Sequence, residues 1–452
     1  MTSTKSCNNE KILSSLSSDK PLCCLLQINP MKKLLYLFCF IPLILPAQDS
    51  LRLETVIEKA TANYPLIRQQ KLVEQSRDFT LSALNRAYLP QLSINGQASY
   101  QSEVTELPVK INIPGFTIEP PDKDQYKIVA DVNQLLYDGG NIGGQKNVQR
   151  INARVEQERI NVDLQKVRER VRQIYLGILM MDEQIKQVEL VSSDLLSGIK
   201  KIESAVKNGI AFRSQLSELK AEELKNNQRK AELKSTRASL LKTISLFTGE
   251  EYNDGTFLIQ PEAVVASMDA YTVQRPELFL FNAQDSLAGA QRKLLGTKSL
   301  PKLSLFAQGG YGRPGLNMLK NDFAWFYIAG ARLNWNLGAL YTLHAEHKVN
   351  EITRSSIRVQ KDLYLLNANI TVEQYRNDIS KYNSLLKDDA AIVSLRDEIM
   401  LAAKSQLNNG VITSADYLQK VNAADQARQQ QLLHRLQLLQ VQLDYNDYIA
   451  KP

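Results

Sequence analysis

The clearest pattern along the chain is a run of apolar residues spaced alternately three and four positions apart. It starts at Leu164 and continues to Val206, and only the polar Ser192 interrupts it. Because this spacing keeps one stripe of a helix apolar, it predicts one long helix from Asn141 to about Lys207 that packs as a coiled coil. At about 1.5 Å per residue such a helix is roughly 100 Å long, which is far longer than a single globular core.

The second half of the chain repeats motifs of the first half. The segment Leu89-Pro90-Gln91-Leu92-Ser93 recurs as Leu300-Pro301-Lys302-Leu303-Ser304, and Asn208-Gly209-Ile210 recurs as Asn409-Gly410-Val411. This duplication predicts two structural repeats, at residues 51–260 and 261–452. Each repeat is expected to contain a helix, a strand pair, a long helix, a turn and a returning helix. The predicted helices span residues 65–88, 141–207 and 210–248 in the first repeat, and 276–298, 339–407 and 412–448 in the second.

Two segments in each half alternate apolar and polar residues in the manner of β-strands. They are residues 92–100 and 126–133 in the first half, and 303–311 and 325–334 in the second. Transmembrane barrel strands have this pattern, but so do the strands of an ordinary soluble sheet. Four strands are too few to close a barrel, and open edges in lipid leave backbone groups unpaired. A membrane role therefore requires several copies of the chain to pool their strands.

The N-terminal region contains an export signal. In residues 31–47, two lysines precede a short apolar run that ends at Pro46-Ala47, which is typical of a cleavable signal peptide. A membrane anchor is the alternative, but the apolar run is shorter than the roughly 20 residues that a spanning helix needs. Residues 1–30 are then an N-terminal extension of unknown role. All four cysteines precede Ala47, so disulfides are not expected in the mature chain.

Composition and motifs argue against catalysis and against nucleic-acid binding. Cleavage after Ala47 leaves 50 Lys and Arg against 46 Asp and Glu, which is a nearly balanced surface. No phosphate-binding glycine loop, nucleophile elbow or zinc motif occurs in the sequence. We therefore expect neither an enzyme nor a cofactor. His344 and His347 lie three positions apart on a predicted helix, with Glu346 between them, and could hold a metal, but we favour the interpretation that they are solvated helix residues.

At these motifs the chain resembles the TolC-like outer membrane efflux proteins, over nearly all of residues 51–448. The duplicated Leu-Pro before an alternating strand, the Asp138-Gly139-Gly140 segment before the long helix and the two Asn-Gly turns carry the resemblance. The resemblance implies a mainly α fold with a transmembrane β-barrel portion. In a homotrimer, four strands per chain would form a 12-stranded barrel in outer-membrane lipid. Long antiparallel coiled-coil helices would continue the barrel as an α-barrel tunnel, with Asp138, Gly139, Gly140 and Gly338 as barrel-to-helix linkers.

The resemblance also implies partners and a gate. Family members dock their helix-turn-helix tips onto a periplasmic adaptor (membrane fusion) protein, which links them to an inner-membrane pump of the RND or ABC type. The matching tip residues are Asn208, Gly209, Ile210, Asn409, Gly410 and Val411, although these triplets also suit plain helix reversals. In the family, acidic residues past the second tip line the narrowest part of the tunnel. Asp416 matches the first such position and Gln419 occupies the second, so one ring of carboxylates is expected, unless Asp416 is only a helix-start carboxylate.

Two functions of different classes therefore remain open from the sequence. The first is an outer membrane channel of a tripartite efflux or secretion system, which passes substrates from the adaptor and pump to the outside through a trimeric tunnel. The alternative is a secreted or surface coiled-coil scaffold, similar to an adhesin, whose alternating segments are soluble hairpins without a channel. Recovery in the outer membrane as a detergent-stable oligomer would distinguish the two.

Overall fold

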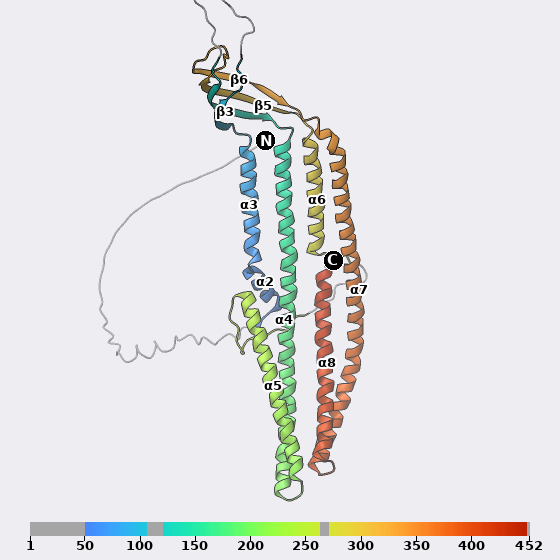
Figure 1. The fold of residues 1–452 in the computed structure, drawn as a ribbon. Coiled ribbons are helices and arrows are strands. Elements are labelled where there is room, and N and C mark those ends of the chain that lie inside the picture. The colour runs from blue at the N-terminus through green and yellow to red at the C-terminus, as the bar shows by residue number, and fades with distance from the viewer. Residues whose placement is uncertain (1–49, 106–120, 263–270, 450–452) are drawn as a thin grey trace, which may run out of the picture. The chain divides into compact units, whose positions relative to one another are not determined.

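The computed structural model describes residues 50–105, 121–262 and 271–449, which form long helices and one four-stranded sheet (Figure 1). The expected extension at 1–30, the signal peptide at 31–47 and all four cysteines lie outside the described residues. Within those residues, no helix holds a stretch apolar and long enough to cross a membrane.

Helix α4 is the element against which most others pack. It spans Asn141–Lys207, as the apolar spacing predicts. It contacts α3 (Leu66–Arg86) and α5 (Arg213–Thr248) from the first half, and α6 (Pro276–Thr297) and α8 (Ser414–Tyr448) from the second. The predicted seam is buried over most of its length, at Leu164, Val167, Val171, Ile174, Ile178, Val188, Leu195, Ile199 and Ile202.

The helix predicted at residues 65–88 is present as α3, and a further helix that was not predicted precedes it. This short helix, α2, spans Leu53–Asn63. The apolar face of α2 packs on α4 and α5, with Val56 and Ala60 fully buried. Pro65 has helical backbone angles at the N-cap position of α3, where its missing N–H costs nothing.

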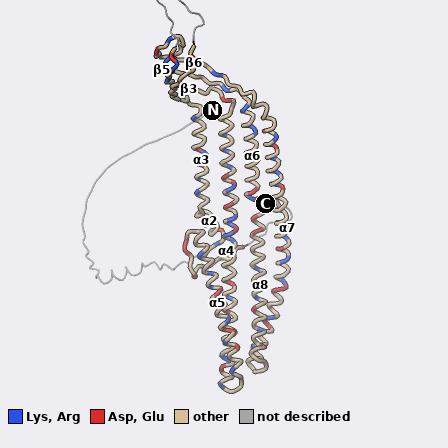
Figure 2. Tube along the Cα trace, viewed as in Figure 1, with Lys and Arg blue, Asp and Glu red and all other residues tan. Residues whose placement is uncertain are grey.

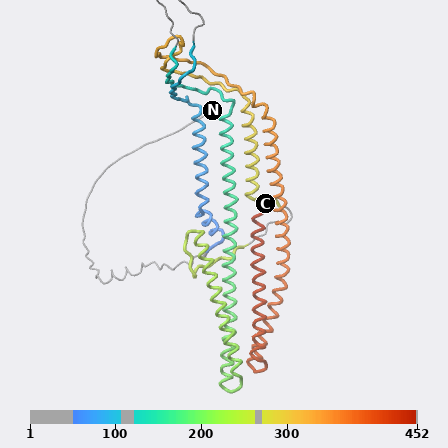
Figure 3. The backbone as a smooth tube through the Cα atoms, viewed as in Figure 1, coloured from blue at the N-terminus to red at the C-terminus, as the bar shows by residue number. Residues whose placement is uncertain are grey.

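The second half is built around α7 (Ala339–Asn408), which contacts α8 and α6. Helix α6 begins where α8 ends, because the N–H of Gln274 donates to the carbonyl of Tyr448 at 3.0 Å and Val273 bridges to Ile449. The two shorter helices α6 and α8 therefore stack end to end beside the longer α7. The backbone trace in Figure 3 shows α6 and α8 following one line between α4 and α7.

The four strands form one antiparallel sheet in the order β2 (Gln91–Tyr100), β3 (Asp124–Tyr137), β5 (Lys302–Arg313) and β6 (Ala324–Asn334). The two predicted hairpins are thus joined through β3 and β5. The register places Ile94, Ala130, Gly309 and Tyr327 in one row, and Ser93, Asp131, Gln308 and Ile328 in the next. Since neighbouring residues point to opposite faces, one face is apolar and the other is largely polar.

The main hydrophobic core lies at mid-length of α4, where α2, α5 and α8 meet it. Tyr175 lies at its centre, and its hydroxyl is within hydrogen-bond distance of the carbonyls of Leu51 (2.7 Å) and Ile259 (2.6 Å). These contacts hold the short parallel pair of β1 (Ser50–Leu51) and β4 (Phe257–Leu258) against the helices. The connector after α5 is therefore packed along the helices where it is described.

Candidate functional site

The two helix reversals, at the ends of α4 and α7, have the same backbone geometry. Gly209 and Gly410 have φ angles of +71° and +72°. The N–H of Ile210 donates to the carbonyl of Ala205, and Gly209 donates to Val206, which together form a Schellman C-cap. Hydrogen bonds at the same positions close the second reversal: the Val411 N–H donates to Gln406, and Gly410 donates to Leu407. Glycine is needed here because an L side chain is strained at this φ.

The reversals present apolar side chains to solvent. Ile210 is 78% exposed and Val411 is 71% exposed. The first reversal adds Phe212, which is 77% exposed and was not singled out from the sequence. Its counterpart in the second reversal is the polar Thr413. All the predicted tip residues thus lie at the two reversals, and the first offers the larger apolar surface.

Asp416 lies in the first turn of α8, where it completes a capping box. The carboxylate accepts hydrogen bonds from the Thr413 hydroxyl (2.7 Å) and the Thr413 N–H (3.2 Å), and the Asp416 N–H donates back to that hydroxyl. These hydrogen bonds from Thr413 hold the pKa of Asp416 below its ordinary value. Both Asp416 and Gln419 are exposed to solvent in the single chain.

The two hairpins meet near their tips in a second hydrophobic cluster. Tyr417 of α8 is fully buried there, and a Cβ placed on Gly198 of α4 would lie 3.4 Å from its ring, so the small residue makes room for the tyrosine. Burial raises the pKa of Tyr417 to about 12. Other apolar members of the cluster come from α4, α5, α7 and α8: Val191, Leu195, Ile199, Leu219, Met400, Leu407, Leu418 and Val421.

Polar contacts also join the two hairpins near the tips. Lys404 of α7 pairs with Asp194 of α4 at 2.9 Å, and the Ser414 hydroxyl donates to Glu218 of α5 at 2.8 Å. The partners come from opposite halves of the chain, and no sequence pattern indicated them. These contacts tie the position of one tip to that of the other.

The predicted linkers lie where the sheet passes into the long helices. Asp138 is buried and accepts from the N–H groups of Gly140 (2.8 Å) and Ile142 (2.5 Å), so it caps the start of α4. Gly139 and Gly140 have positive φ, and a Cβ on Gly139 would lie 2.7 Å from the Cβ of Leu300. This close approach packs the linker against the junction of α6 and β5. Gly338 has helical angles instead and begins the first turn of α7.

A buried ionic cluster lies where α8 ends and α6 begins. Arg172 of α4 pairs with Asp444 (3.1 Å) and Asp447 (2.5 Å) of α8. Arg275, just before α6, pairs with Glu169 of α4 at 2.8 Å. Burial raises the pKa of Asp444 even though Arg172 opposes the shift. The cluster fixes the α6–α8 stack to α4. No sequence pattern indicates it, because its members are far apart in the chain.

The histidine pair is surrounded by basic groups. The Nδ1 atom of His347 accepts a hydrogen bond from Nε of Arg292 at 3.3 Å, and Glu346 pairs with Lys298 at 2.9 Å. A guanidinium beside the imidazole repels a metal cation. In the described parts of the chain, no group of three or more His, Cys, Asp or Glu side chains is placed to hold a metal.

Comparison with known proteins adds to this geometry. Residues 56–250 match the model of the family described as outer membrane efflux protein. No curated protein sequence matches the chain. Solved structures with a similar fold include the outer membrane protein VceC of Vibrio cholerae, at 14% identity and a TM-score of 0.63, over 87% of this chain and 94% of that one.

Two channels from other bacteria are similar over comparable lengths. The CmeC outer membrane channel of Campylobacter jejuni has 14% identity and a TM-score of 0.59, over 88% of this chain and 86% of its own. The MtrE outer membrane channel of Neisseria gonorrhoeae has 13% identity and a TM-score of 0.61, over 87% and 88%. At these identities the structural likeness establishes the shared fold. The chain therefore has the fold of these outer membrane channels, and its residues 56–250 are similar in sequence to the outer membrane efflux protein family.

Proposed function

We propose that the chain is the outer membrane channel of a tripartite efflux or secretion system. Three copies would form a tunnel that carries substrates from a periplasmic adaptor and an inner-membrane pump to the outside. The observation that carries the proposal is the four-stranded sheet, which has one apolar face and two edges that pair with no other strand among the described residues.

The apolar face of the sheet suits lipid. Ile94 and Trp325 are 78% and 82% exposed, although both have large apolar side chains. The strands have 10 to 14 residues, and about 9 to 11 residues suffice for a tilted strand to cross a bilayer. Strands β2 and β6 have free edges that lipid cannot satisfy, so we infer that each edge pairs with a further copy. Three copies supply 12 strands.

The long helices offer a matching contact between copies. Helix α7 exposes an apolar stripe with heptad-like spacing: Val349, Ile352, Val359, Leu363, Leu366 and Ile370. Helix α3 exposes Leu72 and Phe79, seven positions apart. Since α4 contacts α3, and α6 contacts both α4 and α7, these stripes flank the helical layer (Figure 1). Packing α7 of one copy on α3 of the next would bury both and close a ring.

The interspersed charges of the helices fit a water-exposed tunnel rather than a strongly charged binding surface. Figure 2 shows Lys and Arg mixed with Asp and Glu along their length. We propose that the tips dock on the adaptor through Ile210, Phe212 and Val411, whose exposed side chains have no partner in this chain's own core. Asp416 would form one ring of carboxylates near the tunnel end.

The order of elements supports two structural repeats at residues 51–260 and 261–452. A helix, two antiparallel strands, a long helix, a Schellman turn and a returning helix follow one another in each half. Asp138, Gly139, Gly140 and Gly338 would then be the barrel-to-helix linkers of the two repeats. The secreted or surface scaffold gives no role to the apolar face of the sheet.

The membrane assignment can be tested on one strand. Ile94 lies on the apolar face of β2, whereas Gln97 lies on the polar face opposite Lys127. A carboxylate in lipid costs roughly 2–4 kcal/mol at most, whereas one in a water-filled lumen costs little. Ile94→Asp should therefore reduce the amount of heat-modifiable trimer in the outer membrane fraction, and Gln97→Asp should leave it unchanged.

The purified mature protein supplies the second measurement. In detergent we expect the mass of three chains by light scattering, and in a planar bilayer we expect discrete conductance steps. A monomer that stays soluble without detergent and forms no pore would refute the channel and favour the scaffold.

A further inference from the structure

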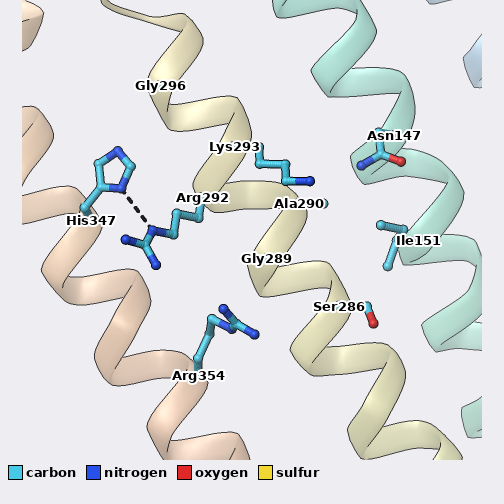
Figure 4. A pocket seen from close by; sticks show the side chains of 10 residues that line it. All are labelled: Asn147, Ile151, Ser286, Gly289, Ala290, Arg292, Lys293, Gly296, His347 and Arg354. Carbon is cyan, nitrogen blue, oxygen red and sulfur yellow. Dashed lines mark hydrogen bonds between the residues drawn. The ribbon is translucent and has the colours of Figure 1, made fainter.

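A basic groove crosses three helices of one chain near the end that carries the sheet. It has a volume of about 630 Å³, and side chains from α4, α6 and α7 line it (Figure 4). Asn147 and Ile151 come from α4, and His347 and Arg354 come from α7. The middle helix, α6, forms the floor. Because one chain provides every wall, the groove does not need an assembly to be complete.

Two cations in the groove form no ion pair with a carboxylate among the described residues, although the charge of Arg292 also acts on Glu351 and helps to lower its pKa. Arg292 makes one described hydrogen bond, to the neutral nitrogen of His347, and Lys293 makes no described polar contact. Both side chains are exposed to solvent at the groove. Their charges are therefore available to an external anion.

The nearby carboxylates are already paired with other cations. Asp285 accepts two hydrogen bonds from the guanidinium of Arg354, at 2.9 and 2.7 Å. Glu351 pairs with Lys348 at 3.1 Å, and Glu346 pairs with Lys298. Glu351 also interacts electrostatically with Arg292. The three carboxylates Asp285, Glu346 and Glu351 thus face five cations, Arg292, Lys293, Lys298, Lys348 and Arg354, so the groove keeps a net positive charge.

The groove is rich in donors. Since Nδ1 of His347 accepts from Arg292, its proton is on Nε2, which can donate. The Asn147 amide adds two N–H donors on the opposite wall. Arginine, lysine and imidazole donors around one space match the several oxygens of a phosphate better than the two of a carboxylate.

The floor leaves room for such a group. A Cβ placed on Gly289 or Gly296 would meet nothing within 4 Å. Figure 4 shows Arg292 extending from α6 toward α7 and Lys293 extending toward α4, both at a level between Gly296 and Gly289. An oxyanion at the floor could therefore approach the helix closely and lie between the two cations.

We propose that this groove binds a phosphate-bearing anion through Arg292, Lys293 and His347. Gly296 precedes Lys302, the first residue of β5, by six positions, so the groove is close to the end of the sheet. If the sheet spans the membrane, as proposed above, a phospholipid headgroup is one source of the phosphate and a free phosphate compound is the other. The binding itself does not depend on the channel function.

The test measures binding of inorganic pyrophosphate to the purified full-length protein in detergent by calorimetry, with chloride at equal ionic strength as reference. Arg292→Gln combined with Lys293→Gln should weaken binding at least about tenfold, because two charge-assisted contacts are lost. Lys200→Gln combined with Lys201→Gln removes the same charge at exposed positions of α4 near the tip and should change nothing. Gly289→Leu keeps the charge but fills the floor, and should also weaken binding.

A second arm distinguishes the sources. Nanodiscs of phosphatidylglycerol with phosphatidylcholine are compared with phosphatidylcholine alone, and co-purified lipid phosphorus is measured for each variant. If wild-type protein enriches the anionic lipid and the groove variants do not, the proposal is supported and the phosphate comes from lipid. If pyrophosphate binds but no lipid is enriched, the proposal is supported and the phosphate comes from a soluble compound. If neither pyrophosphate nor lipid binding differs between the groove and control variants, the proposal is wrong. The channel function is tested separately, by trimer formation and conductance, and that result does not change this conclusion.

Discussion

The two helix reversals end one helix in the same way but begin the next one differently. Both use an Asn-Gly-aliphatic triplet, a positive φ and the same pair of hydrogen bonds. After the second reversal, Thr413 and Asp416 cap α8 with their side chains. After the first, the Phe212 side chain cannot cap α5, and Gln215 only accepts from the Phe212 N–H at 3.3 Å.

This difference separates residues that the turn geometry requires from residues that form an exposed apolar surface. The shared triplet is explained by backbone geometry, so it alone does not indicate docking. Phe212 is different, because the position favours a capping residue and instead holds an exposed aromatic side chain. Exposed aromatic residues of this kind are typical anchors of protein interfaces. We therefore expect the first reversal to contribute more adaptor affinity, and the second to be better ordered.

The largest effect is expected from placing a charge on the shared turn. Gly410→Glu should abolish adaptor pull-down while the trimer stays intact, because a carboxylate is added at an exposed apolar tip and the positive φ becomes strained. Gly209→Glu should act likewise. Gly410→Ala, which introduces the strain without the charge, separates the two causes. Undiminished pull-down of the Gly410→Glu trimer would contradict docking at this tip.

The comparison of the two tips can be sharpened by removing their apolar side chains. Phe212→Ser should weaken adaptor binding roughly ten- to a hundredfold, as expected for an aromatic anchor at an interface. Val411→Ser removes a smaller side chain and should cost no more than about tenfold. The dissociation constants can be measured with immobilised trimer. Equal losses at both sites would show that the tips are equivalent and that Phe212 has no special role.

A smaller effect is expected from the contact that joins the two hairpins. Lys404→Gln breaks the pair with Asp194, and a partly exposed ion pair contributes about 0.2–1 kcal/mol. If the tips close the tunnel, its open probability in a planar bilayer should rise about two- to fivefold. Lys381→Gln is the matched control, since that pair with Asp378 lies within α7. An increase of equal size in the control would mean that helix charge, rather than the contact between hairpins, changes the conductance.

The cap of α8 predicts a local effect. Thr413→Ala removes the hydroxyl that bonds Asp416, and a lost N-cap costs about 1 kcal/mol. Amide exchange in the first turn of α8 should become about fivefold faster. The reverse change, Phe212→Thr, should slow exchange at the start of α5. No change in either helix would show that the rest of the tip, including buried Tyr417, determines local stability.

Sequence patterns predicted the long helices and strands closely because their periods extend over many residues. The apolar spacing from Leu164 to Val206 indicated the long helix α4. The two hairpins were predicted separately, and the structure shows that they join through β3 and β5 into one sheet. Helix α2 was missed because it is short and is stabilised by packing on α4 and α5. The Arg172 and Arg275 pairs could not be predicted, since they join segments that only the folded chain brings together. For the histidine pair the sequence favoured solvated helix residues over a metal site, but it could not predict that Arg292, from another helix, would lie beside His347.

The smallest effect is expected at Asp416. Its pKa lies below the ordinary value because Thr413 bonds the ionised form, so the carboxylate contributes to the cap above its unfolded pKa. That contribution is lost only as the pH falls through the lowered folded pKa, and both the cap and any tunnel charge are constant near neutral pH. Asp416→Asn should reduce the block of conductance by multivalent cations at pH 7, and wild-type block should weaken only in acid, below about 4. Asp388→Asn, at an exposed position of α7, is the control. If Asp416→Asn leaves the cation response unchanged but accelerates amide exchange in α8, Asp416 is a capping residue and does not form the ring.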